Sequence, residues 1–492
     1  MFKSIISKIK AVMYKMGILR GIQEITNHKK VAADEDHYQR IAMWTALYHG
    51  YYSDFHDVRY RTIAGEKTRR MSTLGMPKVI SAELARLVFN EKCAVNISDE
   101  GLSENISQVF EANNFDKEFQ RHLEYGFAKG GFVIKVFADD KGIKLSFVTA
   151  DSFFPISTTR NEVHEGVFVN ETRRGDKYYT LLEWNEWDGE QYVVTNELFM
   201  SEIKGELGIR VPLETLYPNL EQETRINNLS RSVFVYIKPN TANNFDTESP
   251  LGISVYANAL DTLKALDTAF DSFEREFRLG KKRILVPHTA IKSVIDPQSG
   301  EMHRYFDAND EVYQAFNFSD ENGQPFQDVS VSLRVQEHID AIQALLDILA
   351  MQTGFSPGTF TFDAQGVKTA TEVISENSKT FRTKNSHETT IEEGLKELII
   401  TITEIAKLYG FFSAPDDYEV TIDFDDSIAE DREANADYYI KLKNAGLASS
   451  KYTMMKVLDI TEEQAGEMLR EIREEQRTRA PDINEMFGGG EG

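Results

Sequence analysis

Three aspartates near residue 425 are the first candidates for chemistry in this chain. Asp423, Asp425 and Asp426 stand in the segment VTIDFDDSIAEDRE. Two-metal nucleases and other phosphoryl-transfer enzymes place carboxylates at a strand end, because divalent cations need hard oxygen ligands. The alternative is structural: Asp426 or Ser427 caps the next helix, and the acids that follow suit its first turn. We favour the structural interpretation, because a carboxylate cluster within one segment is a weak motif.

Other catalytic patterns are incomplete. The segment AGEKT, Ala64 to Thr68, lacks the first glycine of a phosphate-binding P-loop. The ten histidines are scattered, without an H-E-x-x-H pair or a cysteine partner, so a zinc site has little support. No G-x-S-x-G nucleophile elbow is present. We therefore expect no catalytic residues, no metal and no cofactor, and we predict that the protein is not an enzyme.

Composition restricts the class of partner. The 492 residues are 41% hydrophobic and 27% charged, with a net charge of -24. Tight, sequence-independent wrapping of DNA depends on Lys and Arg, so this charge argues against it. It does not exclude a surface past which DNA moves without being held. No apolar run is long enough for a membrane span, and the basic N-terminal segment, Met1 to Arg20, is better explained as an amphipathic helix than as a membrane anchor.

The elements that must position any site change character along the chain. Up to about residue 130 the pattern is mostly helical, with Ser81 as a candidate N-cap of a helix in the segment from Ser81 to Ile97. Residues from about 130 to 238 are predicted to form a mostly β subdomain, divided by Gly175 and Gly189. A strand is expected again at YEVTIDFD, followed by acidic helices.

A long helix is predicted from Ser249 to Phe277, because Ser249 and Pro250 suit a helix start and Gly280 suits its end. A small α/β insert follows, up to about Ser332. It opens with the basic residues Lys281, Lys282 and Arg283. Solvated charges at a helix end are one interpretation of this patch. A phosphate or partner contact is the other.

The segment Gln352 to Val367 is predicted to be a loop between two helices, Val335–Met351 and Lys368–Tyr409. It contains three glycines and one proline, and its only charged residue is Asp363. Loops of this length without secondary structure are uncommon in compact domains and are usually functional or disordered.

The order of these elements resembles the portal proteins of long-tailed bacteriophages, especially those of Gram-positive hosts. The resemblance rests on the helix Ser249–Phe277, the insert, the helix Val335–Met351, the loop Gln352–Val367 and the long helix after it. FFPI near Phe153 and TIDFDDSIAED add to it. It implies an α+β, predominantly helical fold that assembles as a ring at one capsid vertex.

The resemblance also implies a division of the chain into the parts of a portal. These are a helical and β wing (1–248), a stem helix (249–279), a clip (280–334), a second stem helix (335–351), a tunnel loop (352–367), the long helix with a wing strand (368–425), an acidic helical crown (426–480) and a tail expected to be disordered (481–492).

The function implied by the resemblance is a head-to-tail connector through which double-stranded DNA is packaged and ejected. Its partners would be further copies of itself, usually twelve in all, the terminase large subunit, a head-completion or adaptor protein, and the major capsid and scaffolding proteins. It would reside in the virion and, during assembly, in the host cytoplasm. The competing hypotheses are the Asp423 nuclease and a scaffold whose acidic helices bind a basic partner.

Within that resemblance, the loop is expected to meet passing DNA. We assign the DNA-facing role to Thr359, Thr361, Phe362, Gln365 and Lys368, whose hydroxyl, amide and single ammonium groups would contact phosphates without holding them. The clip residues Lys281, Lys282 and Arg283 are assigned to partner binding.

Overall fold

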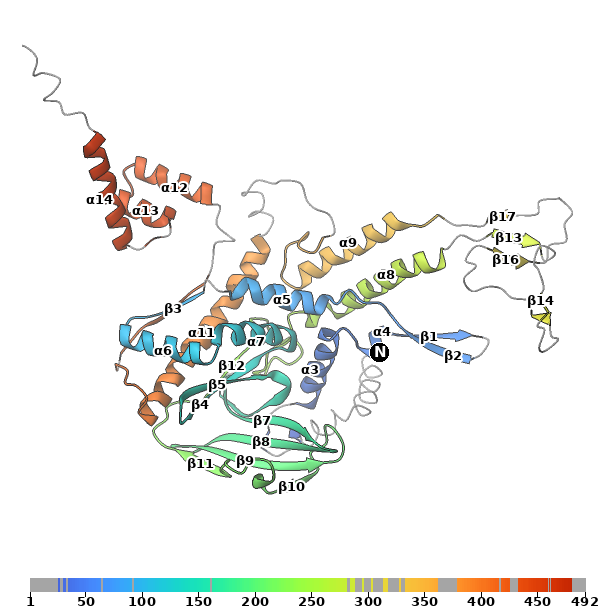
Figure 1. Ribbon diagram of the computed structural model, residues 1–492, viewed down its shortest axis with the longest axis horizontal. Coiled ribbons are helices and arrows are strands. Elements are labelled where there is room, and N and C mark those ends of the chain that lie inside the picture. The colour runs from blue at the N-terminus through green and yellow to red at the C-terminus, as the bar shows by residue number, and fades with distance from the viewer. Residues whose placement is uncertain are drawn as a thin grey trace, which may run out of the picture. The chain divides into compact units, whose positions relative to one another are not determined.

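A computed structural model gives the fold in two units (Figure 1). The larger unit comprises Met1–Asp363 and Arg382–Phe424, and the smaller comprises Ala364–Phe381 and Asp425–Gly492. The residues that the structure describes are 25–26, 30–31, 34–62, 65–90, 93–159, 162–280, 284–287, 294–295, 302–303, 313–316, 327–328, 332–361, 378–415, 417–424, 432–458, 460 and 462–479.

Helices dominate the first part of the larger unit, as predicted. Asp99 caps one of them, because its side chain accepts a hydrogen bond from the Leu102 N–H at 2.7 Å. Gly130 ends another in the left-handed conformation, at a φ of 92°. The helices are α3 (Glu35–Tyr48), α4 (Ser53–His56), α5 (Met76–Val88), α6 (Glu100–Ala112) and α7 (Phe115–Lys129).

A β-hairpin that the sequence did not indicate interrupts these helices. Its strands are β1 (Asp57–Thr62) and β2 (Gly65–Arg70), which pair antiparallel. The pattern in this segment is polar and charged on both faces, so it lacks the apolar alternation by which a half-buried strand is recognised.

The predicted β subdomain is confirmed. One sheet has the order β12-β4-β5, and a second has the order β10-β9-β8-β7-β6 with β11 paired to β9. Gly175 and Gly189, both at a φ of 64°, stand in the two-residue turns of the β7–β8 and β8–β9 hairpins, as expected. The strands are β4 (Phe132–Asp139), β5 (Gly142–Thr149), β6 (Phe153–Thr159), β7 (Glu162–Arg174), β8 (Lys177–Asp188), β9 (Gln191–Ser201), β10 (Ile209–Val211), β11 (Glu223–Ile226) and β12 (Phe234–Ile237).

The long helix α11 (Ser378–Tyr409) supplies much of the apolar core. It continues through Gly394 without a break. The glycine allows a close approach to β12, because a Cβ there would lie 2.9 Å from Cγ1 of Ile237. The predicted end at Tyr409 is confirmed, whereas residues 368–377 lie outside the described residues. The buried apolar side chains of α11 include Ile391, Leu395, Leu398, Ile399, Ile402 and Ile405.

The predicted strand near Thr421 is confirmed as β18 (Val420–Asp423), which pairs antiparallel with β3 (Ala94–Ile97). The predicted helix start at Ser81 is wrong. Helix α5 already begins at Met76, and the buried Ser81 hydroxyl donates to the Pro77 carbonyl at 2.9 Å inside it. Pro77, in the first turn of α5, was a better signal of the helix start than Ser81. The C-terminal part of the predicted helix forms β3, whose partner strand lies more than 300 residues away in the chain.

Helix α8 (Leu260–Leu279) begins later than the predicted Ser249, after a short 3-10 turn at Ala257–Ala259. The preceding segment is buried against α7: the Val255 N–H donates to the Phe127 carbonyl at 3.0 Å. A Cβ on Gly130 would lie 2.5 Å from the Gly252 carbonyl oxygen, so the two backbones are in close contact. Tertiary packing therefore overrides the local capping signal. The predicted end at Gly280 is confirmed.

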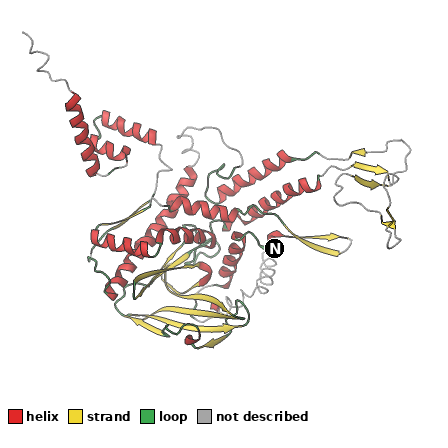
Figure 2. Cartoon of the chain, viewed as in Figure 1, coloured by secondary structure: helices red, strands yellow, loops and turns green. Residues whose placement is uncertain are grey.

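Helix α9 (Val335–Gln352) matches its prediction and packs along α8 (Figures 1 and 2). Between these helices, the described residues of the predicted insert form short strands. β13 pairs in parallel with β16 and antiparallel with β17, and β14 pairs with β15. Their bounds are β13 (Ile284–Pro287), β14 (Val294–Ile295), β15 (Met302–His303), β16 (Tyr313–Phe316) and β17 (Gln327–Asp328).

In the smaller unit, the described part is helical (Figure 2), as predicted for the acidic C-terminal segment. It consists of α12 (Arg432–Asn444), α13 (Ser450–Leu458) and α14 (Glu462–Arg479), with α13 in contact with both of the others. Helices and sheets thus both build the chain, and the predicted α+β class is confirmed.

Candidate functional site

The candidate site is the α8–α9 pair with the loop that follows α9. The two helices bury apolar side chains on their facing stripes, and Leu266 and Leu349 have no exposed surface. The aromatic ring of Phe273 lies 5.7 Å from the imidazole of His338, centroid to centroid, which joins the helices nearer the insert.

The ends of α8 and α9 are fastened together where the chain leaves for the insert and returns. Glu276 accepts hydrogen bonds from Arg334 Nη2 at 3.1 Å and from Arg334 Nε at 3.3 Å. This contact lowers the pKa of the Glu276 carboxyl to about 2. Gly280 fits closely here, because a Cβ on it would lie 2.3 Å from Leu333 Cδ2. We call this junction, Glu276, Gly280, Leu333 and Arg334, the neck.

The other half of α8 is held by two buried carboxylates. Asp267 accepts a hydrogen bond from the Leu74 N–H at 3.0 Å and lies 3.1 Å from Nε2 of the buried His56. Asp271 accepts from both terminal nitrogens of Arg69. The helix is therefore fixed to the segment around β2 by its charged face as well as its apolar one.

The beginning of the loop is a well-formed helix C-cap. Thr353 N–H donates to the Leu349 carbonyl at 3.0 Å and Phe355 N–H donates to the Ala350 carbonyl at 2.8 Å. Gly354 lies between them at a φ of 89°, a conformation that favours glycine. A Cβ on Gly354 would lie 2.6 Å from Cγ2 of Thr383, whose hydroxyl donates to the Gly354 carbonyl at 2.7 Å. Helix α11 therefore holds this turn.

The first half of the loop also folds back on α9. Asp347 accepts a hydrogen bond from the Gly358 N–H at 2.9 Å, and Gln343 Nε2 donates to the Phe360 carbonyl at 3.3 Å. The rings of Phe355 and Phe360 lie 5.1 Å apart, and Phe355 is 1% exposed. Two polar side chains on one face of α9 thus hold the loop backbone.

Three side chains of the loop, those of Thr353, Phe355 and Ser356, are buried. Buried backbone needs partners, and the C-cap and α11 provide them. Of the predicted DNA-facing residues, Thr359 and Thr361 are exposed, and the Thr359 hydroxyl donates to the Ser356 carbonyl at 2.6 Å. The remaining three, Phe362, Gln365 and Lys368, lie outside the described residues.

Gln343, Asp347 and Thr383 are the residues that sequence reasoning missed. Gln343 and Asp347 stand four positions apart, so a polar pair on one helix face was visible in the sequence. The contact of this pair with the loop could not be predicted from the sequence. The predicted partner-binding residues Lys281, Lys282 and Arg283 lie outside the described residues.

The aspartate cluster is only partly described. Asp423 extends from the exposed face of β18 and accepts a hydrogen bond from Asn96 Nδ2 of β3 at 2.6 Å. Asp425 and Asp426 lie outside the described residues. Within the described ranges, no three His, Cys, Asp or Glu side chains gather where they could hold a metal ion. Asp423 thus has the cross-strand partner expected of a structural residue.

Comparison with known proteins supplies the family. The phage portal protein family described as SPP1 Gp6-like matches residues 27–481. No curated protein matches the chain. Among the helices in the described part of the chain, none has the length and apolar character needed to cross a membrane. The match covers nearly the whole chain, including α8, α9, the loop and α11. The chain therefore belongs to the SPP1 Gp6-like family of phage portal proteins and is a structural, non-enzymatic protein of the phage capsid that provides the DNA-packaging channel at its vertex.

Proposed function

We propose that twelve copies of this chain close into a ring whose central channel is lined by the α8–α9 pair. The observation that carries this proposal is the way these helices are fastened. The neck joins them at one end. Two carboxylates anchor α8 further along, and the loop held by Asp347 follows α9. A rigid pair of helices that carries a loop at one end suits the wall of a channel.

The parts of the ring follow the divisions implied by the resemblance. Residues 249–279 and 335–351 are the stem, and residues 1–248 with the strand near Thr421 are the wing. Residues 426–480, which include α12, α13 and α14, are the crown. Contacts of the wing and crown with the major capsid and scaffolding proteins place the ring in the capsid.

Residues 280–334 are the clip, which docks the terminase large subunit during packaging and the head-completion or adaptor protein afterwards. The neck supports this role, because it joins the two ends of the segment. Lys281, Lys282 and Arg283 supply positive charge in a protein whose net charge is -24. A basic patch steers an acidic partner.

Residues 352–367 are the tunnel loop. Its first half is anchored by Asp347 and Thr383. The exposed Thr359 and Thr361 follow that anchor and lie where passing phosphates would contact them. Weak polar contacts suit translocation, because a dense positive charge would bind the DNA and stop it.

The oligomeric state and an activity assay test this proposal together. Light scattering of the purified protein should give the mass of a large ring across physiological salt, and electron microscopy should show particles with a central hole. A monomeric mass would overturn it. Magnesium-dependent DNA cleavage that is abolished by Asp425→Ala would instead support the nuclease alternative.

A further inference from the structure

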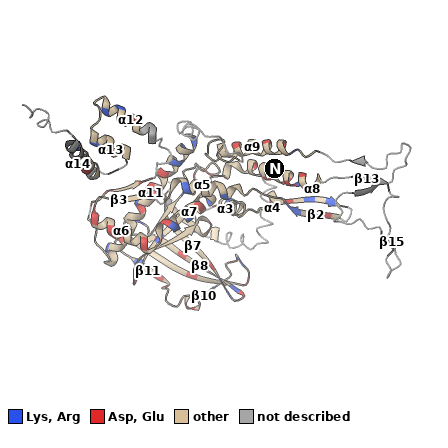
Figure 3. Cartoon of the chain, turned by 45° about the horizontal axis from the view of Figure 1, so that its top comes forward, with Lys and Arg blue, Asp and Glu red and all other residues tan. Residues whose placement is uncertain are grey.

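The β1–β2 hairpin is a basic, exposed surface. Arg59, Tyr60, Arg61 and Lys67 are all exposed, and Tyr60 keeps 44% of its surface accessible. Figure 3 shows the basic residues along this hairpin. Among the residues that the structure describes, no ion-pair partner is found for the three cations. An exposed tyrosine flanked by arginines is the composition of an interface anchor.

The base of the hairpin is held in place. Arg69 pairs with Asp271 of α8, and the Arg70 guanidinium donates to the Gly50 carbonyl at 2.8 Å and lies over the Tyr51 ring at 5.2 Å. An isolated two-stranded hairpin is marginally stable in water. These contacts fix the base, so the exposed tip is presented in a defined direction.

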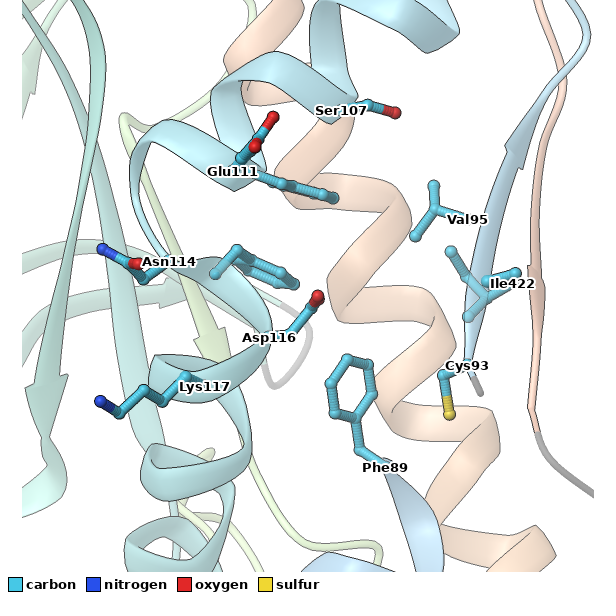
Figure 4. Close-up of a pocket in the computed structure, with 12 residues that line it drawn as sticks. Phe89, Cys93, Val95, Ser107, Glu111, Asn114, Asp116, Lys117 and Ile422 are labelled. Atoms are coloured by element: carbon cyan, nitrogen blue, oxygen red, sulfur yellow. The ribbon is translucent and has the colours of Figure 1, made fainter. Parts of the chain in front are cut away.

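A hollow elsewhere in the larger unit has the complementary chemistry. Its volume is about 450 Å³, within the usual range for binding pockets. Figure 4 shows Phe89, Val95 and Ile422 around it, and Phe110 and Phe115 complete an apolar lining together with Cys93. The lining comes from the end of α5, from α6 and α7, and from the β3–β18 pair.

The rim of the hollow is acidic. Glu111 of α6 and Asp116 of α7 are both exposed at the rim, where Lys117 is the one basic residue that lines it. Glu100 and Glu104 continue the exposed acidic face along α6. An apolar hollow with this rim fits an aromatic side chain on a positively charged segment, which describes Tyr60 on the β1–β2 hairpin.

The hairpin and the hollow lie on different sides of the larger unit: α6 and the β1–β2 hairpin are well separated in both views (Figures 1 and 3). The hairpin therefore does not reach its own chain's hollow. Complementary patches on different sides of one subunit generate a head-to-tail contact, and such contacts form a ring when the rotation between neighbouring copies closes.

We propose that Tyr60 of each copy inserts into the Phe-lined hollow of the next copy, and that the positive charge of the hairpin lies against the acidic rim formed by Glu111 and Asp116. This inference rests on the proposed ring and names a contact that holds it together. Burial of the aromatic ring stabilises the contact, and the charges select the direction in which copies join.

Cross-linking through the chain's single cysteine tests this contact, because Cys93 lies in the hollow. Lys67 is the cross-strand neighbour of Tyr60, so Lys67→Cys puts a thiol beside the anchor and leaves Tyr60 intact. Each copy then carries one thiol at the hairpin and one at the hollow. A short thiol-specific cross-linker should yield a ladder of covalent chains longer than dimers in a denaturing gel.

Two controls separate this result from chance contact. Adding Cys93→Ser to Lys67→Cys should remove every band above the dimer. Ile209→Cys, at a site 63% exposed in β10, should give no ladder with Cys93. Rings that form without a ladder overturn the Tyr60 contact and leave the proposed function standing. Absence of rings in the unmodified protein overturns both.

A charge exchange supplies an independent measure. Arg59→Glu with Arg61→Glu should raise the subunit concentration for half-maximal ring assembly by at least about tenfold, the scale expected for an interface anchor. Adding Glu111→Lys and Asp116→Lys should restore assembly, because the hairpin and the rim again carry charges of opposite sign. Unchanged thermal melting of the dissociated subunit shows that the fold is intact. Failure of the rescue in a folded variant contradicts the proposal.

Discussion

Asp271 of α8 and Arg69 of β2 form a bidentate ion pair. Arg69 Nη1 donates to Asp271 Oδ1 at 2.7 Å and Nη2 donates to Oδ2 at 2.5 Å. The Ser72 N–H adds a third hydrogen bond to the same carboxylate at 3.1 Å. Arg69 is the main reason that the pKa of Asp271 lies below its usual value. One carboxylate thus fastens helix α8 to the segment that leaves the hairpin.

We expect Arg69→Ala to destabilise the subunit by about 2 kcal/mol, because it leaves a buried carboxylate without its charged donor. Chemical denaturation monitored by circular dichroism measures this. Arg86→Ala is the matched control: Arg86 pairs with Glu83 in an exposed i,i+3 bridge, whose loss should cost under about 1 kcal/mol. Equal effects of the two substitutions would contradict the anchoring role.

Asp347→Ala should release the first half of the tunnel loop. The Gly358 N–H loses its acceptor, so we expect faster hydrogen exchange at Gly358 and Thr359 with rings of normal size. The matched control is Asp340→Ala, because Asp340 accepts a hydrogen bond from a glutamine four residues earlier, Gln336, at 2.8 Å and makes no hydrogen bond to the described part of the loop. Unchanged exchange at Gly358 in Asp347→Ala would show that the hydrogen bond is not needed.

Thr361→Asp with Gln365→Glu should alter DNA packaging into proheads, because both add negative charge where phosphates are proposed to pass. Thr361 is exposed, and changes at such sites usually shift stability by less than about 0.5 kcal/mol. Ring size and melting temperature should therefore be normal. Collapse of ring assembly in this variant would make the loop an intersubunit packing element instead.

Replacement of Lys281, Lys282 and Arg283 by Glu should weaken binding to the terminase or the adaptor protein and spare the ring. Reversal of an exposed rim charge mainly changes the association rate and its salt dependence. Binding kinetics at two salt concentrations measure both. Loss of the ring itself in this variant would assign the three residues a structural role.

Acid should destabilise the subunit through the buried His387 of α11. Its Nδ1 accepts a hydrogen bond from the Asn240 N–H at 3.0 Å, and burial lowers its pKa to about 4. Because the folded state favours the neutral imidazole, stability is complete above the unfolded pKa of about 6.5 and falls as the pH drops towards 4, by on the order of 3 kcal/mol in total.

His387→Gln keeps an acceptor but cannot titrate, so it should reduce the slope of stability against pH between about 6.5 and 4. Part of the slope should remain, because burial also lowers the pKa of His37 to about 4. His49→Gln, at an exposed histidine, is the control. An unchanged slope in His387→Gln would show that this imidazole is not linked to folding.

The sequence predicted correctly those elements that are determined by local residue types and spacing. The turns at Gly175 and Gly189, the helix end at Gly280 and the whole of Val335–Met351 follow from glycine conformation and apolar spacing. The family resemblance came from the order of these elements.

The predictions that were wrong or missing have a common physical cause. Ser249 is a good cap in isolation, but the segment after it gains more by burial against α7, where Val255 bonds to Phe127. The contacts of Asp347 with Gly358 and of Asn96 with Asp423 depend on which segments meet in three dimensions. Spacing along the chain does not contain that information.

The neck has an evolutionary consequence. The chain leaves α8 after Gly280 and returns to α9 after Leu333, and Glu276 and Arg334 hold these two ends together. Sequence inserted, deleted or exchanged between those two points adds length to a loop whose ends are already fixed, so the entropic cost to the rest of the protein grows only slowly with its length. The segment can therefore be replaced as a cassette. Under the proposed assignment of this segment as the clip, a phage that acquires a new packaging motor or tail would change what its portal recognises while the remainder of the chain stays as it is.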